Sequence, residues 1–296
     1  MNLPKRILLS FIFLGMVNCT SAQEIPTLEL EAYKRIDPPA RNEVSGIIKS
    51  QNLEGVFWVH GDSGTPDKIY AINIDGDLVA GDDYRGAEVI GAGNTDWEDL
   101  AYTANGFILI GEIGNNCECR DDLKVIVIEE PAPDADEVDV IAEYYITYPK
   151  RNDLMGKLLR SNYNAEALFE YNGEIYILTK QSSKTMLFHI ENPQNQKQHE
   201  LKLIETFDTE HYVTAADVSP DQKYLAVLTY DQILVFEPKD GQFFGNSYKT
   251  AFLDDTKQIE SVTFDGTDLI IAEEDGQLYR ISMNDLVEVQ RVQNED

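Results

Sequence analysis

The chain has 296 residues, of which 43% are hydrophobic and 26% are charged. This composition is typical of a globular protein large enough to bury a substantial core. The 24 lysines and arginines stand against 53 aspartates and glutamates, so the formal net charge is −29. So acidic a surface repels phosphate backbones and anionic lipid, which argues against nucleic acid and membrane-surface partners and favours bound cations.

The first 22 residues have the pattern of a secretory signal peptide. Lys5 and Arg6 precede the apolar run 7–17, which is too short to span a bilayer. Thr20-Ser21-Ala22 then offers the small residues of a cleavage site. We therefore expect residues 23–296 to form a single domain, soluble in the periplasm or outside the cell, with an oligomeric state that the sequence leaves open.

The three cysteines raise two separate questions. Cys19 resembles the lipidated residue of bacterial lipoproteins, so an outer-membrane lipoprotein is the alternative location, although Asn18 stands where a small residue is usual. Cys117 and Cys119 form a Cys-x-Cys segment. Export permits a disulfide there, and the sequence leaves open whether the pair is a local disulfide or two free thiols.

Five similar segments follow one another along the chain, and each precedes a short hydrophobic run. They are residues 43–47, 96–100, 164–168, 214–218 and 258–262. Hairpin signals such as Asn105-Gly106 and Asn172-Gly173 separate the paired strands. Third strands are predicted at 69–74, 123–128, 186–190, 233–236 and 278–281, and fourth strands, for example, at 144–148 and 201–207.

Repeats of roughly 40 to 50 residues with four strands each predict the blades of an all-β propeller. One four-stranded sheet cannot bury both faces alone, whereas blades stacked around an axis bury each face against a neighbour. We expect a five-bladed propeller, with six blades as the alternative. The last repeat is short of a fourth strand, which either residues 27–36 or residues 286–292 would supply.

The five segments begin the innermost strands in this interpretation, so their matched positions form a ring at one mouth of a central channel. Aligned, the ring contains Ser45, Glu98, Glu166, Ala216 and Glu260. Two unit charges about 5 Å apart repel by about 3 kcal/mol at an effective dielectric constant near 20. The three carboxylates therefore either hold protons in a solvated acidic channel or surround a hard cation, for which a wide oxygen ring favours calcium over magnesium.

These motifs resemble those of the periplasmic SdiA-regulated propellers over most of the mature chain. The order of serine, glutamate, glutamate, small residue and glutamate also resembles the axial calcium ring of the calcium-activated apyrases. That resemblance implies that Ser45, Glu98, Glu166 and Glu260 are calcium ligands, whereas Ala216 departs from it, because a serine is expected there. The substrate-binding motifs of the apyrases are not recognisable, so nucleotide hydrolysis is not implied.

The ends of the second strands reach the same mouth, fourteen residues after each ring position or seventeen in the first repeat. Carboxylates, amides and two cations on one concave face could bind a polar ligand or do acid–base chemistry. The alternative is that these residues bind no ligand and form a rim of solvated acidic loops. The candidate ligand-binding residues are Asp62, Asp96, Asp99, Glu112, Asn115, Asn116, Arg120, Lys180, Asp217, Tyr230 and Glu274.

Two classes of function remain. The first is a calcium-stabilised binding or scaffold protein of the cell envelope whose partner is a polar small molecule or another envelope protein. The second is a calcium-dependent hydrolase, similar to a phosphoesterase, acting at the acidic mouth. No set of nucleophile, base and orienting group is recognisable, and Gly61-Asp62-Ser63-Gly64 has no histidine in a suggestive position. This favours the first class.

Overall fold

The computed structural model describes residues 24–149, 163–209, 211–254 and 256–291. Within these ranges the chain forms strands, turns and loops without a helix, which confirms the all-β prediction. No helix in this part of the chain is long and apolar enough to cross a membrane. The predicted signal peptide (residues 1–22) and Cys19 lie outside the described residues.

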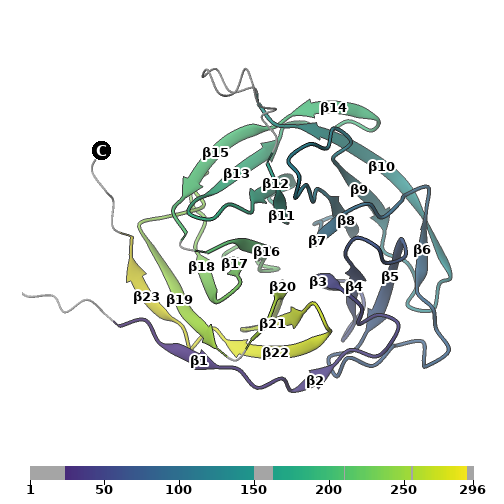
Figure 1. Ribbon diagram of the computed structural model, residues 1–296, viewed down its shortest axis with the longest axis horizontal. Coiled ribbons are helices and arrows are strands. Elements are labelled where there is room, and N and C mark those ends of the chain that lie inside the picture. Colours follow the sequence, from purple (N-terminus) through teal and green to yellow (C-terminus); the bar gives the residue numbers. More distant parts are fainter. Residues whose placement is uncertain (1–23, 150–162, 210, 255, 292–296) are drawn as a thin grey trace, which may run out of the picture.

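The strands form four hydrogen-bonded sheets that are arranged around a common centre (Figure 1). The largest sheet contains β3 (Val44–Lys49), β4 (Phe57–Gly61), β5 (Lys68–Ile72), β6 (Ala87–Ile90), β10 (Glu137–Thr147), β9 (Lys124–Glu129), β8 (Phe107–Glu112) and β7 (Trp97–Tyr102), with β14 (Lys197–Glu200) beside β10. The next contains β11 (Ala165–Tyr171), β12 (Glu174–Thr179), β13 (Thr185–Ile190) and β15 (Lys202–Phe207).

The other two sheets hold both ends of the described chain. One contains β16 (Val213–Val218), β17 (Leu225–Thr229), β18 (Gln232–Phe236) and β19 (Ser247–Asp254), with β1 (Thr27–Glu29) and β23 (Val287–Gln290) on its outer edge. The last contains β20 (Ile259–Asp265), β21 (Asp268–Glu273), β22 (Gln277–Ser282) and β2 (Lys34–Arg35).

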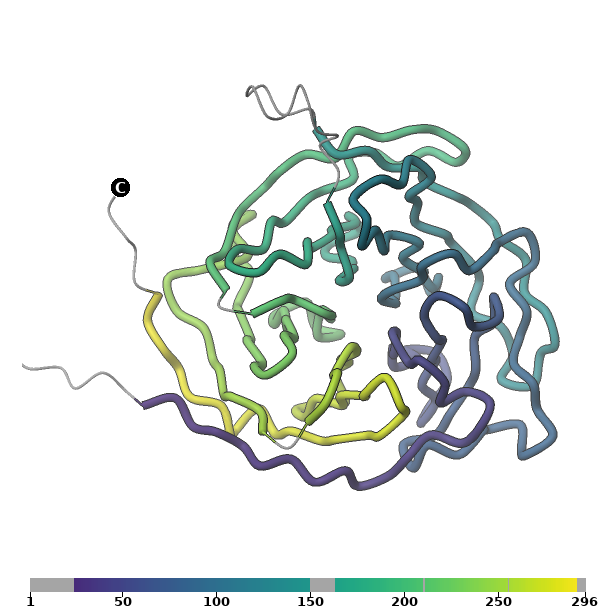
Figure 2. The backbone as a smooth tube through the Cα atoms, viewed as in Figure 1, coloured from purple at the N-terminus to yellow at the C-terminus, as the bar shows by residue number. Residues whose placement is uncertain are grey.

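Five innermost strands surround the centre, and each contacts the next in chain order. The contacts run from β3 to β7, β11, β16 and β20, and β20 returns to β3 (Figures 1 and 2). The sheets therefore pack face to face, and every residue of β7 and β16 is buried. Trp58 on β4 and Trp97 on β7 are fully buried in one cluster between neighbouring groups of strands. Burial on both faces explains why the strands are nearly continuous apolar runs in the sequence.

The N-terminal segment supplies the outermost strand beside β22. Lys34 of β2 pairs with Leu278 in antiparallel fashion. The rival segment near the C-terminus instead forms β23, which pairs with β19, where Thr250 faces Val287. Strand β1 runs parallel to the rest of β19, so the outer edge of this sheet is covered by both ends of the described chain. Covering an outer edge prevents unwanted pairing with other chains.

Asp99 links three of the inner strands through hydrogen bonds to its side chain. Its side chain is fully buried, and Oδ2 accepts hydrogen bonds from the backbone N–H groups of Leu168 (3.1 Å) and Ala216 (2.9 Å). Oδ1 accepts the N–H of Leu100 (2.9 Å). Burial raises the pKa of this carboxyl well above its usual range, while the three N–H donors act in the opposite direction. The carboxylate thus bonds β7 to β11 and β16.

This position differs from the predicted one, which put Asp99 and Asp217 at the channel mouth. Asp99 instead reaches backbone N–H groups in the middle of β11 and β16, at Leu168 and Ala216, rather than the loops at the mouth. Asp217 Oδ2 likewise accepts hydrogen bonds from Thr263 Oγ1 and Phe264 N, both at 2.9 Å. It lines a cavity of about 330 Å³ near the far ends of β3, β16 and β20.

Replacing Asp99 with alanine should lower the free energy of unfolding by about 2–4 kcal/mol, because two N–H groups at the inner sheet edges lose their acceptor. Urea unfolding of Asp99→Ala measures this loss. Asp221→Ala is the matched control, since this exposed carboxylate bonds only near its own turn, and it should stay within about 0.5 kcal/mol of the wild type. Equal stability of the two variants would contradict the bridging role.

Candidate functional site

Each inner strand begins with a β-bulge, and the bulged residues meet at one mouth of the channel. The pairing register of every first hairpin shifts by one residue close to its start. A bulge leaves one residue unpaired and re-aims its side chain. The residues at these shifts are Ser45, Glu98 with Asp99, Glu166, Thr214 and Glu260.

The structure corrects the fourth ring position from Ala216 to Thr214. Val213 pairs with Thr229, and the register shifts between Val213 and Ala215. The alignment assumed fourteen residues between the ring position and Tyr230, whereas Thr214 lies sixteen residues before Tyr230, because the turn between β16 and β17 is longer. The segment Ser219-Pro220-Asp221-Gln222 was the available signal, since it is a longer turn than Asn172-Gly173.

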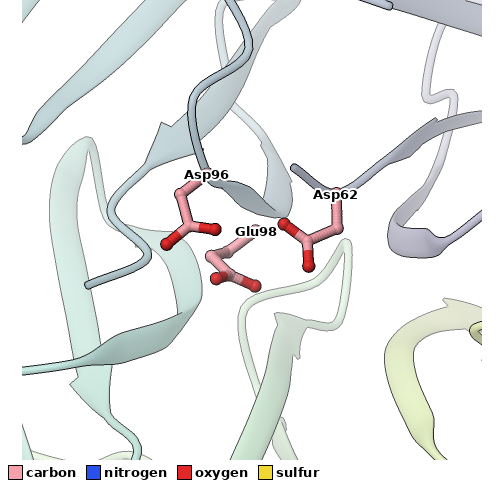
Figure 3. A group of neighbouring side chains, drawn as sticks. All are labelled: Asp62, Asp96 and Glu98. Atoms are coloured by element: carbon pink, nitrogen blue, oxygen red, sulfur yellow. The ribbon is translucent and has the colours of Figure 1, made fainter. Parts of the chain in front are cut away.

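Three carboxylates converge at the mouth between β4 and β7. Asp62 follows β4, Asp96 precedes β7, and Glu98 lies in the bulge of β7. One oxygen from each lies within 4.8 Å of the others, and Figure 3 shows the three carboxylates pointing toward one another. Glu98 is 5% exposed, and the other two are half-buried. A group of oxygen donors at this separation suits a hard cation such as calcium.

Glu112 and Arg120 position the loop that carries Asp96. Glu112 is buried, and its carboxylate accepts hydrogen bonds from the backbone N–H groups of Thr95 and Asp96, both at 3.0 Å. Arg120 pairs with the same carboxylate (2.5 Å) and donates to the carbonyl of Gly114 (2.7 Å). Both residues were predicted to bind a ligand, and the contacts described here are structural.

Asn94 holds the loop of Asp62 against the start of β7. Its Nδ2 donates to the carbonyls of Gly61 (2.9 Å) and Asp62 (3.1 Å), and its Oδ1 accepts the N–H of Trp97 (3.1 Å). The sequence analysis did not identify Asn94, because nothing in its local pattern reveals a contact with a loop some thirty residues away.

Gly114 makes room for the converging carboxylates. A Cβ atom at this position would lie 2.2 Å from Glu98 Oε1 and 2.5 Å from Asp96 Oδ2. Those distances are far below van der Waals contact, so any larger residue would displace the carboxylates. The sequence alone gives no sign of this constraint, which exists only because β8 brings Gly114 beside the start of β7.

Asn115 organises the loop that follows β8. It is buried, and its Oδ1 accepts the N–H groups of Cys119 and Arg120, both at 3.0 Å. Cys117 and Cys119 form a disulfide, which resolves the alternative that the sequence left open. Asn115 therefore fixes the backbone at Arg120.

Asn116 and Lys180 connect to the second ring carboxylate, Glu166. Asn116 is exposed, and its Oδ1 accepts a hydrogen bond from Asn164 Nδ2 (3.0 Å), which also donates to Glu166 (3.3 Å). Lys180 forms an ion pair with Glu166 and lies over the ring of Tyr230, 4.9 Å from its centroid. These predicted mouth residues do lie beside the ring.

Burial and neighbouring negative charges act to raise the pKa values of the carboxyl groups at the mouth. Burial raises the pKa of Glu98 well above its usual range, and the charges of Glu166 and Asp62 add to this effect. Burial also acts to raise the pKa of Glu166, while the opposing charge of Lys180 acts to lower it. The pKa of Glu260 is raised for the same first reason.

Burial and neighbouring carboxylates likewise raise the pKa values of the carboxyl groups at the rim of the mouth. Burial and the charge of Asp62 raise the pKa of Asp96 to about 6. Burial, followed by a contact with Glu43, raises the pKa of Glu274 to about 7. Backbone hydrogen bonds link these loops, since Asp62 N donates to the Glu43 carbonyl at 2.7 Å. The mouth therefore gathers many acids around few cations, which is the arrangement that attracts a metal ion.

Comparison with known proteins places the chain by its fold alone. No protein-family model and no curated protein sequence matches it. Among solved structures, glutaminyl cyclase from Myxococcus xanthus is 8% identical with a TM-score of 0.51, over 91% of this chain and 100% of that chain. The PQQ-bound aldose sugar dehydrogenase from Streptomyces coelicolor is 9% identical with a TM-score of 0.49, over 88% of this chain and 99% of that chain. The likeness to the cyclase supports a β-propeller fold.

Without metal, the protein should become less stable between pH 5 and pH 7, because Asp96 keeps a proton to about pH 6 when folded but loses it near pH 3.9 when unfolded. The folded state then binds more protons, so the free energy of unfolding falls as pH rises, by about 1 kcal/mol. Urea unfolding in the presence of a chelator measures the slope. Asp96→Asn should flatten it, whereas Glu200→Gln on exposed β14 should not. An unchanged slope in the first variant would refute the assignment.

Proposed function

We propose that this protein is an exported, calcium-binding β-propeller that acts as a binding or scaffold module of the cell envelope. The observation that carries the proposal is the convergence of Asp62, Asp96 and Glu98 within 4.8 Å at the channel mouth. Like charges this close repel strongly when partly buried, and a divalent cation would turn that repulsion into attraction. An all-oxygen site of several carboxylates favours calcium.

The remaining ring residues support an axial ion beside this group. Thr214 Oγ1 donates a hydrogen bond to the carbonyl of Ile259 (2.9 Å), and Ser45 Oγ donates to the carbonyl of Trp97 (3.1 Å). Each hydroxyl thus uses its proton on the next inner strand and keeps its lone pairs for a cation. With Thr214 in place of Ala216, the ring order comes closer to that of the apyrases, in which a serine is expected at this position.

We propose that the propeller has five blades. Five inner strands contact one another in a closed cycle, and each begins a hairpin that continues outward. The fourth strand of the last blade is then β2, and β10 both completes the second blade and pairs with β6 of the first. A sixth blade would require a sixth inner strand, and the described residues provide none.

The partner is expected to be a polar small molecule or another envelope protein that meets the acidic mouth. Nucleic acid is an improbable partner for a chain with a net charge of −29. The location is the periplasm or the cell exterior after signal cleavage, or the outer membrane if Cys19 is lipidated. These assignments rest on the sequence of the first 22 residues.

A calcium-dependent hydrolase, similar to a phosphoesterase, is the second candidate. The observation that favours it is the place of Asp96, a half-buried carboxylate at the mouth within 4.8 Å of Asp62 and Glu98. A carboxylate positioned beside a bound cation can act as a general base. The fold does not choose between the candidates, because propellers support many functions.

Calcium at 1 mM should raise the melting temperature by roughly 5 °C, as expected for a site with a Kd near 10 μM. Gly114→Ala should abolish most of this increase, because its Cβ would fall on the Glu98 and Asp96 carboxylates. Gly93→Ala is the matched control, since a Cβ there meets nothing within 4 Å. Thermal melts with and without calcium give the answer, and an equal calcium increment in both variants would rule out this site.

If the second candidate is right, the purified protein should hydrolyse simple phosphate or carboxylic esters only with calcium present. Asp96→Asn should then reduce kcat by at least roughly 100-fold, the usual contribution of a general base, with calcium affinity measured in parallel. Steady-state assays on a panel of chromogenic esters test this. A loss of activity that merely follows lost calcium binding would argue against a role for Asp96 as a base.

A further inference from the structure

One positive charge already sits among the acids of the mouth. Lys180 follows β12, and its side chain is only 15% exposed. Its ammonium pairs with Glu166, and it is the positive charge that acts on Glu98 and Glu260 as well. A lysine in this position does in part what a bound metal ion would do.

We propose that Lys180 is a built-in competitor for the cation site: its ammonium neutralises the mouth in the metal-free protein and weakens the binding of a divalent cation. This inference rests on the proposed calcium site. A cation that enters the ring must either repel the ammonium or displace it from Glu166. Lys180 therefore sets the metal affinity without being a metal ligand.

Among the described residues, Lys180 is held by a single carboxylate, whereas Arg120 is held by two carboxylates and a carbonyl. Arg120 is held at several points, by Glu112 (2.5 Å), by Asp122 (2.9 Å) and by the carbonyl of Gly114 (2.7 Å). Lysine instead carries a single ammonium on a flexible stem. In the position where it pairs with Glu166, Lys180 Nζ also lies 4.9 Å from the ring centroid of Tyr230, which adds a cation–π contact.

The chain contains a close match to this arrangement away from the mouth. Lys124 on β9 pairs with Glu143 on β10 (2.5 Å), and its Nζ lies 5.8 Å from the ring centroid of Tyr145. Its side chain is 16% exposed, nearly the same as that of Lys180. Removing Lys124 therefore controls for the loss of a half-buried lysine ion pair over a tyrosine.

The experiment compares calcium binding by isothermal titration calorimetry in the wild type, Lys180→Met, Lys180→Arg and Lys124→Met. Methionine keeps the apolar stem and removes the charge, whereas arginine keeps the charge. We expect Lys180→Met to bind calcium roughly tenfold more tightly, since a unit charge a few ångströms away is removed. Lys180→Arg and Lys124→Met should bind within roughly twofold of the wild type. If Lys180→Met does not fold, Lys180→Gln replaces it.

The outcomes separate this inference from the proposed function. Calcium binding that is equal or weaker in Lys180→Met than in the wild type would overturn the competitor role and leave the calcium site standing. Binding by Lys180→Met but not by the wild type would support the competitor role and refute calcium binding by the natural protein. If no variant binds calcium, both fail, and tighter binding in Lys124→Met as well would overturn the specific role of Lys180.

Discussion

The inner edge of each sheet faces the channel and has no neighbouring strand, so its backbone groups and bulged side chains must find partners across the axis. Buried N–H groups without an acceptor are costly, and this constraint governs the interior. Asp99 supplies an acceptor to β11 and β16, because its carboxylate accepts hydrogen bonds from the N–H groups of Leu168 and Ala216. Asp217 does the same for Phe264 on β20. Carboxylates are thus part of what joins the sheets, as well as a feature of the site.

The same constraint explains why the mouth is acidic and ordered at once. The bulges turn Glu98, Glu166 and Glu260 toward the channel, where they repel one another. Rigid loops prevent the repulsion from simply spreading them apart, since Glu112 and Asn94 fix the segments that carry Asp96 and Asp62. The mouth is therefore built around a concentration of negative charge that solvent alone would not favour. Such preorganisation is what a selective cation site needs.

Lys180 modifies this picture by supplying an internal counter-ion. A ring of carboxylates with no cation beside it would favour proton uptake. A ring with an immobile arginine beside it would repel metal ions under all conditions. A lysine that shares its interactions between Glu166 and the face of Tyr230 lies between these limits. In the proposed competition, Lys180 neutralises part of the acidic charge until a divalent cation binds. The balance between the acids and this one ammonium would then set the proposed response to calcium, rather than the acids alone.

The sequence by itself determined the all-β repeat, the hairpins and the acidic segments, because strand periodicity and turn signals such as Asn105-Gly106 act locally. It also aligned Glu98, Glu166 and Glu260 as matched positions at the starts of the inner strands. Only the tertiary structure decided that Asp62 and Asp96 converge on Glu98, that Asp99 faces inward, that Thr214 replaces Ala216 in the ring, and that β2 rather than β23 pairs with β22. These depend on pairing register and on loops that meet from distant repeats. Since a one-residue shift in register reverses the side a residue faces, local pattern could not fix them.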